Sequence, residues 1–374
     1  MFQLLKQDKN TKARRGTITT EHGVIQSPFF MPVGTNATVK SLLLEHLLEF
    51  NAQIVLSNTY HLFLRPGMDV IEAAGGLHQF MNWERPILTD SGGYQVFSLT
   101  QFRKIKDDGV QFKSHIDGST HFFTPERVID IQCILGSDMM MPLDVCAPYP
   151  CSLKEAKNSV EKTTEWAKRS KDHFVRQDVR APKQFLFGII QGAIYKDLRE
   201  RSTEEILDVN MDAYAIGGVS VGEPVEEMFK TLDWVLPKLP KDKPRYFMGI
   251  GLPDQIVKAV GEGVDMFDTC IPTRYGRHAS AFTAKGKIII RNQEFAKDFF
   301  PLDPDCDCMV CRKYTRSYLR HLMHSNELTG LTLISYHNVY FYVNLMRKIR
   351  AAIEEDRYEK FQMDFLKKYG SELI

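Results

Sequence analysis

The sequence predicts an α/β fold, a closed (β/α)8 TIM barrel, and two features of the chain indicate it. Short apolar runs alternate along most of the chain with segments whose apolar residues recur at helical spacing. Polar residues or glycine turns follow most of these runs, as they do at the carboxyl ends of barrel strands. The repeated alternation favours a closed barrel over an open sheet. The expected strands are residues 28–33, 52–58, 86–90, 138–144, 185–191, 213–218, 245–251 and 265–268.

Other segments depart from the simple alternation. Residues 110–123 alternate in hydropathy around an Asp-Gly pair, which predicts a hairpin inserted after the third barrel strand. A second hairpin is expected at 281–291, and the region 280–340 is expected to be an insertion near the last strand, held by a metal. The whole chain, 1–374, is expected to be one barrel domain. Helices are expected at 152–177 and at about 339–355, with a charged tail behind the second.

Composition excludes several classes of protein. Apolar residues make up 43% and charged residues 25%, which is ordinary for a globular chain and argues against disorder or a disulfide scaffold. No apolar run approaches the ~18–20 residues that a membrane helix needs, and the first residues show no secretory leader, so a cytoplasmic location is expected. The formal net charge of +1 argues against nucleic-acid binding by bulk charge.

The cysteines suggest a metal site. Their number is seven, which is odd, and this favours reduced thiols. Cys306, Cys308 and Cys311 place three soft sulfur ligands within reach of one ion, and a tetrahedral zinc site needs a fourth ligand. Spacing alone does not choose among the downstream histidines. The alternative, three merely buried thiols, suits the polar and turn-rich surroundings poorly. The candidate histidines are His321, His324 and His337.

Carboxylates end three of the expected strands. An aspartate after a strand is most often a turn residue or a helix cap, so each of Asp90, Asp144 and Asp268 alone is weak evidence. Together they place three carboxylates on one rim, where apolar surroundings require partners or a raised pKa. Two carboxylates there permit a double displacement at a sugar carbon, one as nucleophile and one as acid and then base.

Other side chains on this rim suit a flat ligand. Glycine turns let backbone amides approach a planar molecule closely, and Tyr94 and Met248 offer faces for an aromatic ring. A basic strip adjoins the last strand: residues 274–320 hold ten lysines and arginines against five acids. An ordinary solvated face is the alternative, but the strip is also a candidate phosphate-binding surface beside the rim.

Several sequence motifs of this chain resemble those of a known enzyme family. The chain resembles the tRNA-guanine transglycosylases, also called queuine tRNA-ribosyltransferases, of the bacterial homodimeric type. The matching stretches occur in the family's order and cover essentially the whole chain. They are FMPVGTNATVK, NTYHL, LTDSGGYQVFSL, LDVCAPYP, GIIQGA, YAIGGVSVGEP, YFMGIG, VDMFDTCIPTRYGR and CDCMVC.

The resemblance implies a zinc-stapled barrel that exchanges the wobble guanine of GUN-type tRNAs for a 7-deazaguanine. Asp268 would be the nucleophile at C1′ of the ribose, and Asp90 the general acid and base. Arg274 and Arg277 would hold the anticodon loop. The implied base-binding residues are Ser91, Tyr94, Asp144, Gln191, Gly218, Val219 and Met248, and the implied ligands of one structural zinc are Cys306, Cys308, Cys311 and His337.

The chain departs from the usual bacterial pattern in three places, of which the first two line the region expected to hold the 7-substituent. Val145 stands where an acid is usual, and Val219 and Ser220 replace the common Leu-Ala pair. Tyr275 stands where asparagine or serine is frequent. The bacterial substrate, 7-aminomethyl-7-deazaguanine (preQ1), carries an ammonium that favours an acid. The loss of that acid weakens the argument for preQ1, and Ser220 resembles the eukaryotic, queuine-using enzymes, but Cys146 and Val221 keep the bacterial pattern. We therefore expect preQ1 as a substrate, with a relaxed or shifted preference toward queuine as the alternative.

Two other functions were weighed. A non-catalytic tRNA-binding subunit would lack the nucleophile or the base pocket, yet Asp268, Asp90 and the Gly-Gly turns are present. A glycoside hydrolase also uses two carboxylates on a barrel, but it has no need for the basic strip or the cysteine cluster.

Overall fold

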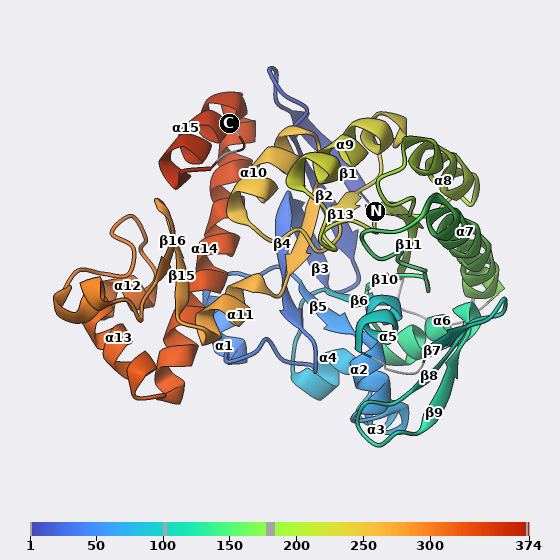
Figure 1. The fold of residues 1–374 in the computed structure, drawn as a ribbon, viewed down its shortest axis with the longest axis horizontal. Coiled ribbons are helices and arrows are strands. Elements are labelled where there is room, and N and C mark those ends of the chain that lie inside the picture. Colours follow the sequence, from blue (N-terminus) through green and yellow to red (C-terminus); the bar gives the residue numbers. More distant parts are fainter. Residues whose placement is uncertain (1, 100–102, 177–183, 372, 374) are drawn as a thin grey trace.

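The computed structural model describes residues 2–99, 103–176, 184–371 and 373, and its centre is a closed barrel of eight parallel strands (Figure 1). The strands follow one another around the barrel in chain order, and the last pairs with the first. This confirms the predicted fold class. The strands are β4 (Phe29–Gly34), β5 (Val55–Asn58), β6 (Ile87–Asp90), β10 (Met139–Met140), β11 (Phe185–Ile190), β12 (Ala213–Ile216), β13 (Arg245–Phe247) and β14 (Met266–Thr269).

Each expected strand overlaps an observed one, but several observed strands are shorter. The run 138–144 contributes only Met139–Met140 to the ladder, and 245–251 contributes only Arg245–Phe247. The remaining residues leave the sheet at its carboxyl end and form the turns above the barrel. Apolar composition predicts burial rather than strand: residues 141–144 are buried without being strand, whereas in the second turn Met248 is half-buried and Gly249 is exposed.

Alternation along each strand builds two cores. In β4, Phe29 and Met31 point into the barrel interior, whereas Phe30 packs outward among the helices. The period of two in strand side chains produces this separation. The interior is filled by side chains from all around the barrel, including Leu56, Leu88 and Tyr246. A filled interior keeps the barrel rigid beneath its carboxyl-end rim.

Helices cover the outside of the barrel. The sequence of α6 shows why one begins and ends where it does: Thr124 accepts a hydrogen bond from Arg127 N at its start, Pro125 follows, and Gly136 ends it with a positive φ. The helix expected at 152–177 is α7, although residue 177 lies outside the described residues. These helices are α1 (Leu44–Glu49), α2 (Thr59–Leu64), α3 (Met68–Ala73), α4 (Leu77–Met81), α5 (Gly93–Leu99), α6 (Pro125–Leu135), α7 (Leu153–Arg176), α8 (Lys196–Asp208), α9 (Val225–Val235), η1 (Leu236–Lys238), α10 (Pro253–Gly261) and α11 (Ile271–Arg277).

Two small antiparallel sheets flank the barrel. The first, at the N-terminus, is formed by β1 (Phe2–Gln7), β2 (Arg14–Thr20) and β3 (Gly23–Ser27), and the sequence analysis did not predict it. The second confirms the hairpin expected at 110–123. It adds a strand to that hairpin, so its members are β7 (Arg103–Ile105), β8 (Val110–Lys113) and β9 (Thr120–Phe123).

The C-terminal part begins with the second expected hairpin, which is confirmed as β15 (Ser280–Thr283) and β16 (Gly286–Ile289). The helix expected from about residue 339 begins earlier and is α14 (Leu328–Glu354), which runs along the barrel beside α11 and β4. The expected tail holds a further helix, because Phe361, Phe365 and Tyr369 recur at helical spacing. No helix among the described residues has the length and apolarity to cross a membrane. The remaining elements are η2 (Gln293–Lys297), α12 (Met309–Lys313), α13 (Arg316–His324), α14 (Leu328–Glu354) and α15 (Tyr358–Tyr369).

Candidate functional site

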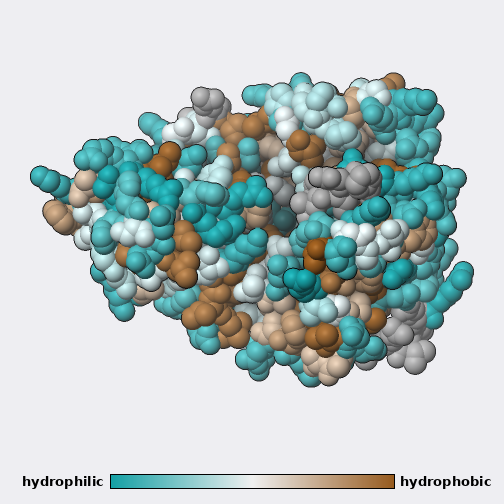
Figure 2. Space-filling model, turned by 60° about the horizontal axis from the view of Figure 1, so that its bottom comes forward, coloured by the Kyte–Doolittle hydropathy of each residue, from teal (hydrophilic) through white to brown (hydrophobic). Residues whose placement is uncertain are grey.

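The three candidate carboxylates lie at the carboxyl ends of barrel strands. Asp90 is the last residue of β6, Asp268 is the third residue of the four-residue strand β14, and Asp144 follows β10 by four residues. Figure 2 turns the lower side of Figure 1 forward, and this face is hollowed near its middle between hydrophilic and hydrophobic surface. A rim of this kind is where barrel enzymes hold their reactive groups.

Asp268 is held through one of its two oxygens. Tyr246, from the neighbouring strand β13, donates its hydroxyl to Oδ1 over 2.6 Å, and the amide of Gly249 donates to the same oxygen over 2.8 Å. Burial raises the pKa of Asp268 even so. Within the described part of the chain, no donor contacts Oδ2. The carboxylate is thus fixed in orientation with one oxygen left to react.

Asp90 has a different environment. Asn58 Nδ2 donates to its Oδ2 over 2.5 Å, and the amides of Thr59 and Gly92 donate to Oδ1 over 3.2 and 3.1 Å. Burial raises the pKa of Asp90 to about 7, and the nearby charge of Asp268 acts in the same direction. A group with this pKa is close to half protonated at neutral pH, which suits it to give and take a proton.

Asp144 and Gln191 form a hydrogen-bonded pair. Gln191 Nε2 donates to Asp144 Oδ2 over 2.8 Å, and the Ser91 hydroxyl lies 3.5 Å from Oδ1. Burial raises the pKa of Asp144 to about 6. Gln191 Oε1 is buried with no hydrogen-bond donor, and a Cβ on Gly218 would lie only 2.1 Å from it. The site therefore requires glycine at 218, whose φ is +62°, and keeps a free acceptor beside a carboxylate.

The other expected base-binding residues are Met248, Val219 and Tyr94. Met248 follows β13, with its sulfur 3.5 Å from the position of a Cβ on Gly217. Val219 is buried. Tyr94, in α5, is 53% exposed, so its ring is open to a ligand. A thioether and a phenol ring are suitable surfaces for a planar molecule.

The two expected tRNA-binding arginines follow Asp268 on α11. Arg274 is exposed, whereas Arg277 is half-buried and its Nη1 has no acceptor in the described structure. Between them, Tyr275 stacks on Phe282, with their ring centroids 5.7 Å apart. The short helix α11, which begins three residues after Asp268 in the chain, thus carries two arginine side chains.

Several contributing residues were missed by the sequence analysis. The rule of looking at strand ends finds Asp90 and Asp268 but overlooks Tyr246, which lies within β13 and points into the barrel. Arg199 was missed because a charged residue on a helix is usually solvated, whereas this one is fully buried. Glu223, whose carboxylate accepts from the amides of Ser220 and Val221, had only its place after the glycine turn as a signal.

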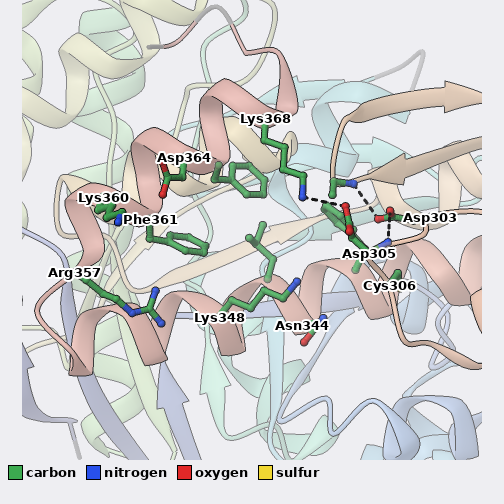
Figure 3. Close-up of a pocket in the computed structure, with 14 residues that line it drawn as sticks. Asp303, Asp305, Cys306, Asn344, Lys348, Arg357, Lys360, Phe361, Asp364 and Lys368 are labelled. Carbon is green, nitrogen blue, oxygen red and sulfur yellow. Dashed lines mark hydrogen bonds and ion pairs between the residues drawn. The ribbon is translucent and has the colours of Figure 1, made fainter.

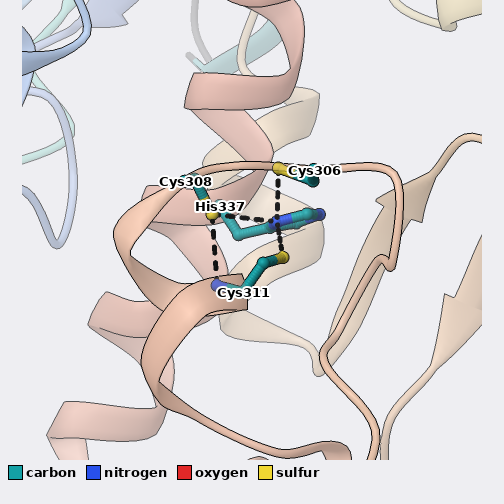
Figure 4. A group of neighbouring side chains, drawn as sticks. All are labelled: Cys306, Cys308, Cys311 and His337. Carbon is teal, nitrogen blue, oxygen red and sulfur yellow. Dashed lines mark hydrogen bonds between the residues drawn. The ribbon is translucent and has the colours of Figure 1, made fainter.

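The cysteine cluster gathers around one histidine (Figure 4). His337 Nδ1 lies 3.8, 3.5 and 3.3 Å from the sulfurs of Cys306, Cys308 and Cys311. A tetrahedral zinc with ordinary bond lengths would separate nitrogen from sulfur by about 3.6 Å. His337 Nε2 donates to Phe282 O over 2.6 Å, which leaves the lone pair of Nδ1 facing the sulfurs. These residues therefore fit a metal ion.

The other two candidate histidines lie elsewhere. His321 and His324 belong to α13, and His324 Nε2 lies 3.2 Å from the carbonyl oxygen of Arg291. Of the three histidines that spacing left open, His337 is the one that joins the cysteines.

A second group of metal-ligand residue types lies at the opposite end of the barrel. Asp138 accepts from His22 Nδ1 over 2.9 Å and from the amide of Ile87 over 2.9 Å, and His78 Nε2 is 3.3 Å away. The His22 and His78 rings stack with an interplanar angle of 13°. Rings stacked 3.5 Å apart lie in nearly parallel planes, so one ion cannot lie in the planes of both, as coordination by both lone pairs requires. We call this group a clamp, because Asp138 joins the β2–β3 turn, α4 and the start of β6 through its contacts with His22, His78 and Ile87.

A cavity of about 390 Å³ lies between α14, α15 and the loop that leads to Cys306 (Figure 3). Its lining includes the aromatic rings of Phe361 and Phe365 and several charged side chains, among them Lys348 and Lys368. None of the rim carboxylates lines this cavity. It is therefore separate from the barrel rim and adds no group to the candidate site.

Comparison with known proteins agrees with this geometry. Residues 8–371 match a family model described as queuine tRNA-ribosyltransferase. A protein of that name from Caldanaerobacter subterraneus subsp. tengcongensis is 54% identical over 368 residues, covering 98% of this chain and 97% of the relative. Proteins of the same name from Thermoanaerobacter pseudethanolicus and Desulforudis audaxviator are 54% and 52% identical, covering 99% and 98% of this chain and 97% of each relative.

Proposed function

Because this chain belongs to the queuine tRNA-ribosyltransferase family, we propose that it is a tRNA-guanine transglycosylase of queuosine modification. It exchanges guanine at the wobble position of GUN-type tRNAs for a 7-deazaguanine. One observation carries the proposal: Asp268 is fixed through a single oxygen beside Asp90, a carboxyl whose pKa is about 7. That pairing supplies a nucleophile and a proton carrier on one rim.

The residues support a double displacement. Asp268 Oδ2 attacks C1′ of the ribose as the C1′–N9 bond breaks, and the bond's electron pair leaves with guanine. Asp90 gives its proton to the departing base. The incoming base then loses a proton to Asp90 and attacks C1′, which releases Asp268. Tyr246 and Gly249 hold Asp268 Oδ1 throughout, so the nucleophile needs no reorientation between the two steps.

The base is held between donors and acceptors. Asp144 and the free oxygen of Gln191 accept from the N–H groups of the base, and the backbone at Gly218 and Val219 donates to its carbonyl oxygen. Ser91 orients Asp144. Tyr94 and Met248 cover the two faces of the ring. Such a pocket requires that the nucleotide be flipped out of the anticodon loop.

The experiment that tests the function is to trap the intermediate. The wild-type protein is incubated with a GUN-type tRNA without added base and then denatured. We expect an adduct of protein and tRNA that survives denaturation and disappears when free guanine is added first. A tRNA with adenine at the wobble position is the control. Absence of both adduct and guanine exchange would refute the proposal.

The identity of the incoming base is a finer question. Val145, buried beside the Asp144 carboxylate, offers no charge to an ammonium group, whereas Glu223 is engaged by the amides of Ser220 and Val221. Cys146 and Val221 nevertheless keep the bacterial pattern, so we propose preQ1 as a substrate, with queuine as the competitor. The two bases should be competed for exchange against labelled guanine in tRNA. A higher kcat/KM for queuine would overturn the choice of preQ1.

We propose that Cys306, Cys308, Cys311 and His337 hold one structural zinc ion. Four protein ligands leave no open position, so the metal would staple the loop before α12 to α14 and take no part in the reaction. A strong chelator should release about one zinc per chain and loosen this region, as measured by hydrogen exchange. If removal of the metal abolished adduct formation while the hydrogen-exchange rates and the tRNA affinity stayed unchanged, a structural role would be contradicted.

The basic strip at 274–320 and the exposed Arg274 are proposed to bind the anticodon loop. Binding through phosphates releases counterions, so tRNA affinity should fall as salt rises from 50 to 200 mM. An affinity that stays flat over this range would contradict the assignment.

We further propose a cytoplasmic homodimer, since tRNA is the substrate and the family resemblance implies two subunits. The insertion exposes large apolar side chains that suit a protein contact, namely Phe299, Phe300, Tyr318 and Leu328. Light scattering at micromolar concentration should give twice the mass of 43.0 kDa, and a monomer at that concentration would argue against it.

A further inference from the structure

Arg199 is a fully buried cation with an unusual set of partners. Its guanidinium donates to four backbone carbonyls, and no carboxylate among the described residues forms an ion pair with it. Burial lowers its pKa to about 10, so it remains charged at neutral pH. A buried charge without a counter-ion costs stability, which calls for a functional reason. The acceptors are Ala193 O at 2.8 Å, Ile190 O at 2.9 Å, Gly217 O at 2.7 Å and Gly218 O at 3.0 Å.

These bonds fix the direction of two successive peptides. In a planar trans peptide the N–H points opposite to the carbonyl of the preceding residue. Since the carbonyls of Gly217 and Gly218 converge on Arg199, the N–H groups of Gly218 and Val219 point away from it. Over the described residues, neither N–H has an acceptor. Arg199 thus leaves two adjacent donors free on the far side of the turn.

The free donors face the candidate base site. Gln191 Oε1 lies beside the Cα of Gly218, and the same side chain bonds Asp144. The Met248 sulfur lies beside Gly217. Two amide donors next to a carboxylate and an amide oxygen complement the edge of a guanine-type base, with the donors on its 6-oxygen.

We propose that Arg199 is a positioning residue for this reaction. It aims the N–H groups of Gly218 and Val219 at the 6-oxygen of the base and strengthens them as donors. The inference rests on the proposed function. When the C1′–N9 bond breaks, its electron pair moves into guanine and negative charge spreads to the 6-oxygen. Donors backed by a cation stabilise that charge more than the neutral ground state, so Arg199 contributes chiefly to kcat.

The first test needs no variant. Guanine and 2-aminopurine differ by the 6-oxygen and by the proton on N1, and both should be measured as competitive ligands of the wild-type protein. We expect guanine to bind at least about 100-fold more tightly, because 2-aminopurine leaves the two amide donors without an acceptor and offers Asp144 no N1 proton. Equal affinities would overturn the inference, whereas guanine exchange into tRNA would still support the proposed function.

The second test uses Arg199→Lys and Arg199→Met. Lysine keeps the charge but cannot bridge four carbonyls, since it lacks the planar fork of arginine. We expect kcat to fall about 100-fold with KM for tRNA nearly unchanged, and the preference for guanine over 2-aminopurine to fall at least tenfold. Arg14→Lys is the matched control: Arg14 is equally buried but lies at the other end of the barrel, bonded to Asp265.

The outcomes separate the two claims. Arg14→Lys should lower the melting temperature without changing the guanine preference. If folded Arg199 variants keep the wild-type guanine preference, Arg199 is only structural and the inference fails. If the wild-type protein exchanges no guanine at all, the proposed function itself fails.

Discussion

Buried aspartates lie at both ends of the barrel strands, and their surroundings differ. At the amino ends, Asp265 accepts from Arg14 over 2.9 and 2.5 Å, and Asp138 is held by Ile87 and by two histidines. Although burial alone would raise it, hydrogen bonds lower the pKa of Asp138 to about 2. At the carboxyl ends, no described cation pairs with Asp90, Asp144 or Asp268, and burial raises the pKa of all three.

The difference separates stability from chemistry. A carboxylate whose lone pairs are filled by donors stabilises the fold in its ionised form. A carboxylate that is buried without a cationic partner is destabilised when ionised. That free energy favours its reaction with a proton or with a carbon electrophile. The same residue type thus serves as a clamp at one end of the barrel and as a reactive group at the other. Four substitutions or pH changes test this contrast.

The largest effect is expected for Asp268→Asn. The amide cannot act as a nucleophile, so adduct formation should fall by at least about 1,000-fold, while the barrel stays folded because Asn keeps an acceptor for Tyr246. Single-turnover trapping of the tRNA adduct measures this. A tRNA binding assay on the same variant is the control and should change little. Persistence of the adduct would remove Asp268 as nucleophile.

Asp265→Asn, three residues earlier, should show the reverse. It leaves Arg14 buried beside a neutral group, which costs about 3–5 kcal/mol of unfolding free energy. Urea unfolding at neutral pH measures this loss. The rate of adduct formation per folded molecule should stay within about twofold of the wild type, and a loss comparable with that of Asp268→Asn would contradict the separation of the two ends.

Asp90→Asn should stabilise the protein. Because the pKa of Asp90 is raised to about 7, the folded state keeps its proton to higher pH than the unfolded chain does. Stability from this group therefore declines as pH rises from about 4 to about 7, and removing the charge recovers roughly 2–4 kcal/mol at pH 8. Urea unfolding at pH 4 and pH 8 checks this, and the gain should vanish at pH 4. An equal gain in unfolding free energy at pH 4 and pH 8 would show that the stabilisation comes from packing and not from the charge of Asp90.

Asp138 should affect the pH dependence of stability in the opposite direction from Asp90, and by a smaller amount. With its pKa lowered to about 2, the unfolded chain takes up the proton first as pH falls, so stability is full above about pH 4 and is lost between about pH 4 and 2. The loss is about 2 kcal/mol. Comparing wild type with Asp138→Asn by thermal unfolding at pH 7 and pH 3 isolates it, since the variant's deficit should shrink at pH 3. A deficit independent of pH would indicate lost shape complementarity instead.

Local patterns sufficed for much of the fold. Alternation and turn residues located the barrel strands and both hairpins, because backbone propensity and burial act over a few neighbouring residues. They failed for the N-terminal sheet, and they placed the start of α14 too late. The first of its residues are apolar without an obvious start signal, and Glu327 makes no side-chain cap. The α15 helix was taken for a charged tail because its buried face is narrow: Tyr358 and Leu366 are its buried residues.

The sequence by itself determined which residue types stand at the ends of the strands, and through its motifs it determined the family. These follow from chain order, which the sequence contains in full. Only the tertiary structure decided that His337 meets the three cysteines, that Tyr246 holds Asp268, and that Arg199 lies buried beneath the Gly217-Gly218 turn. Each of these depends on elements far apart in the chain being packed at a fixed distance. The pKa of a carboxyl depends in the same way on its surroundings, so two aspartates identical in sequence terms became a clamp and a reactive group.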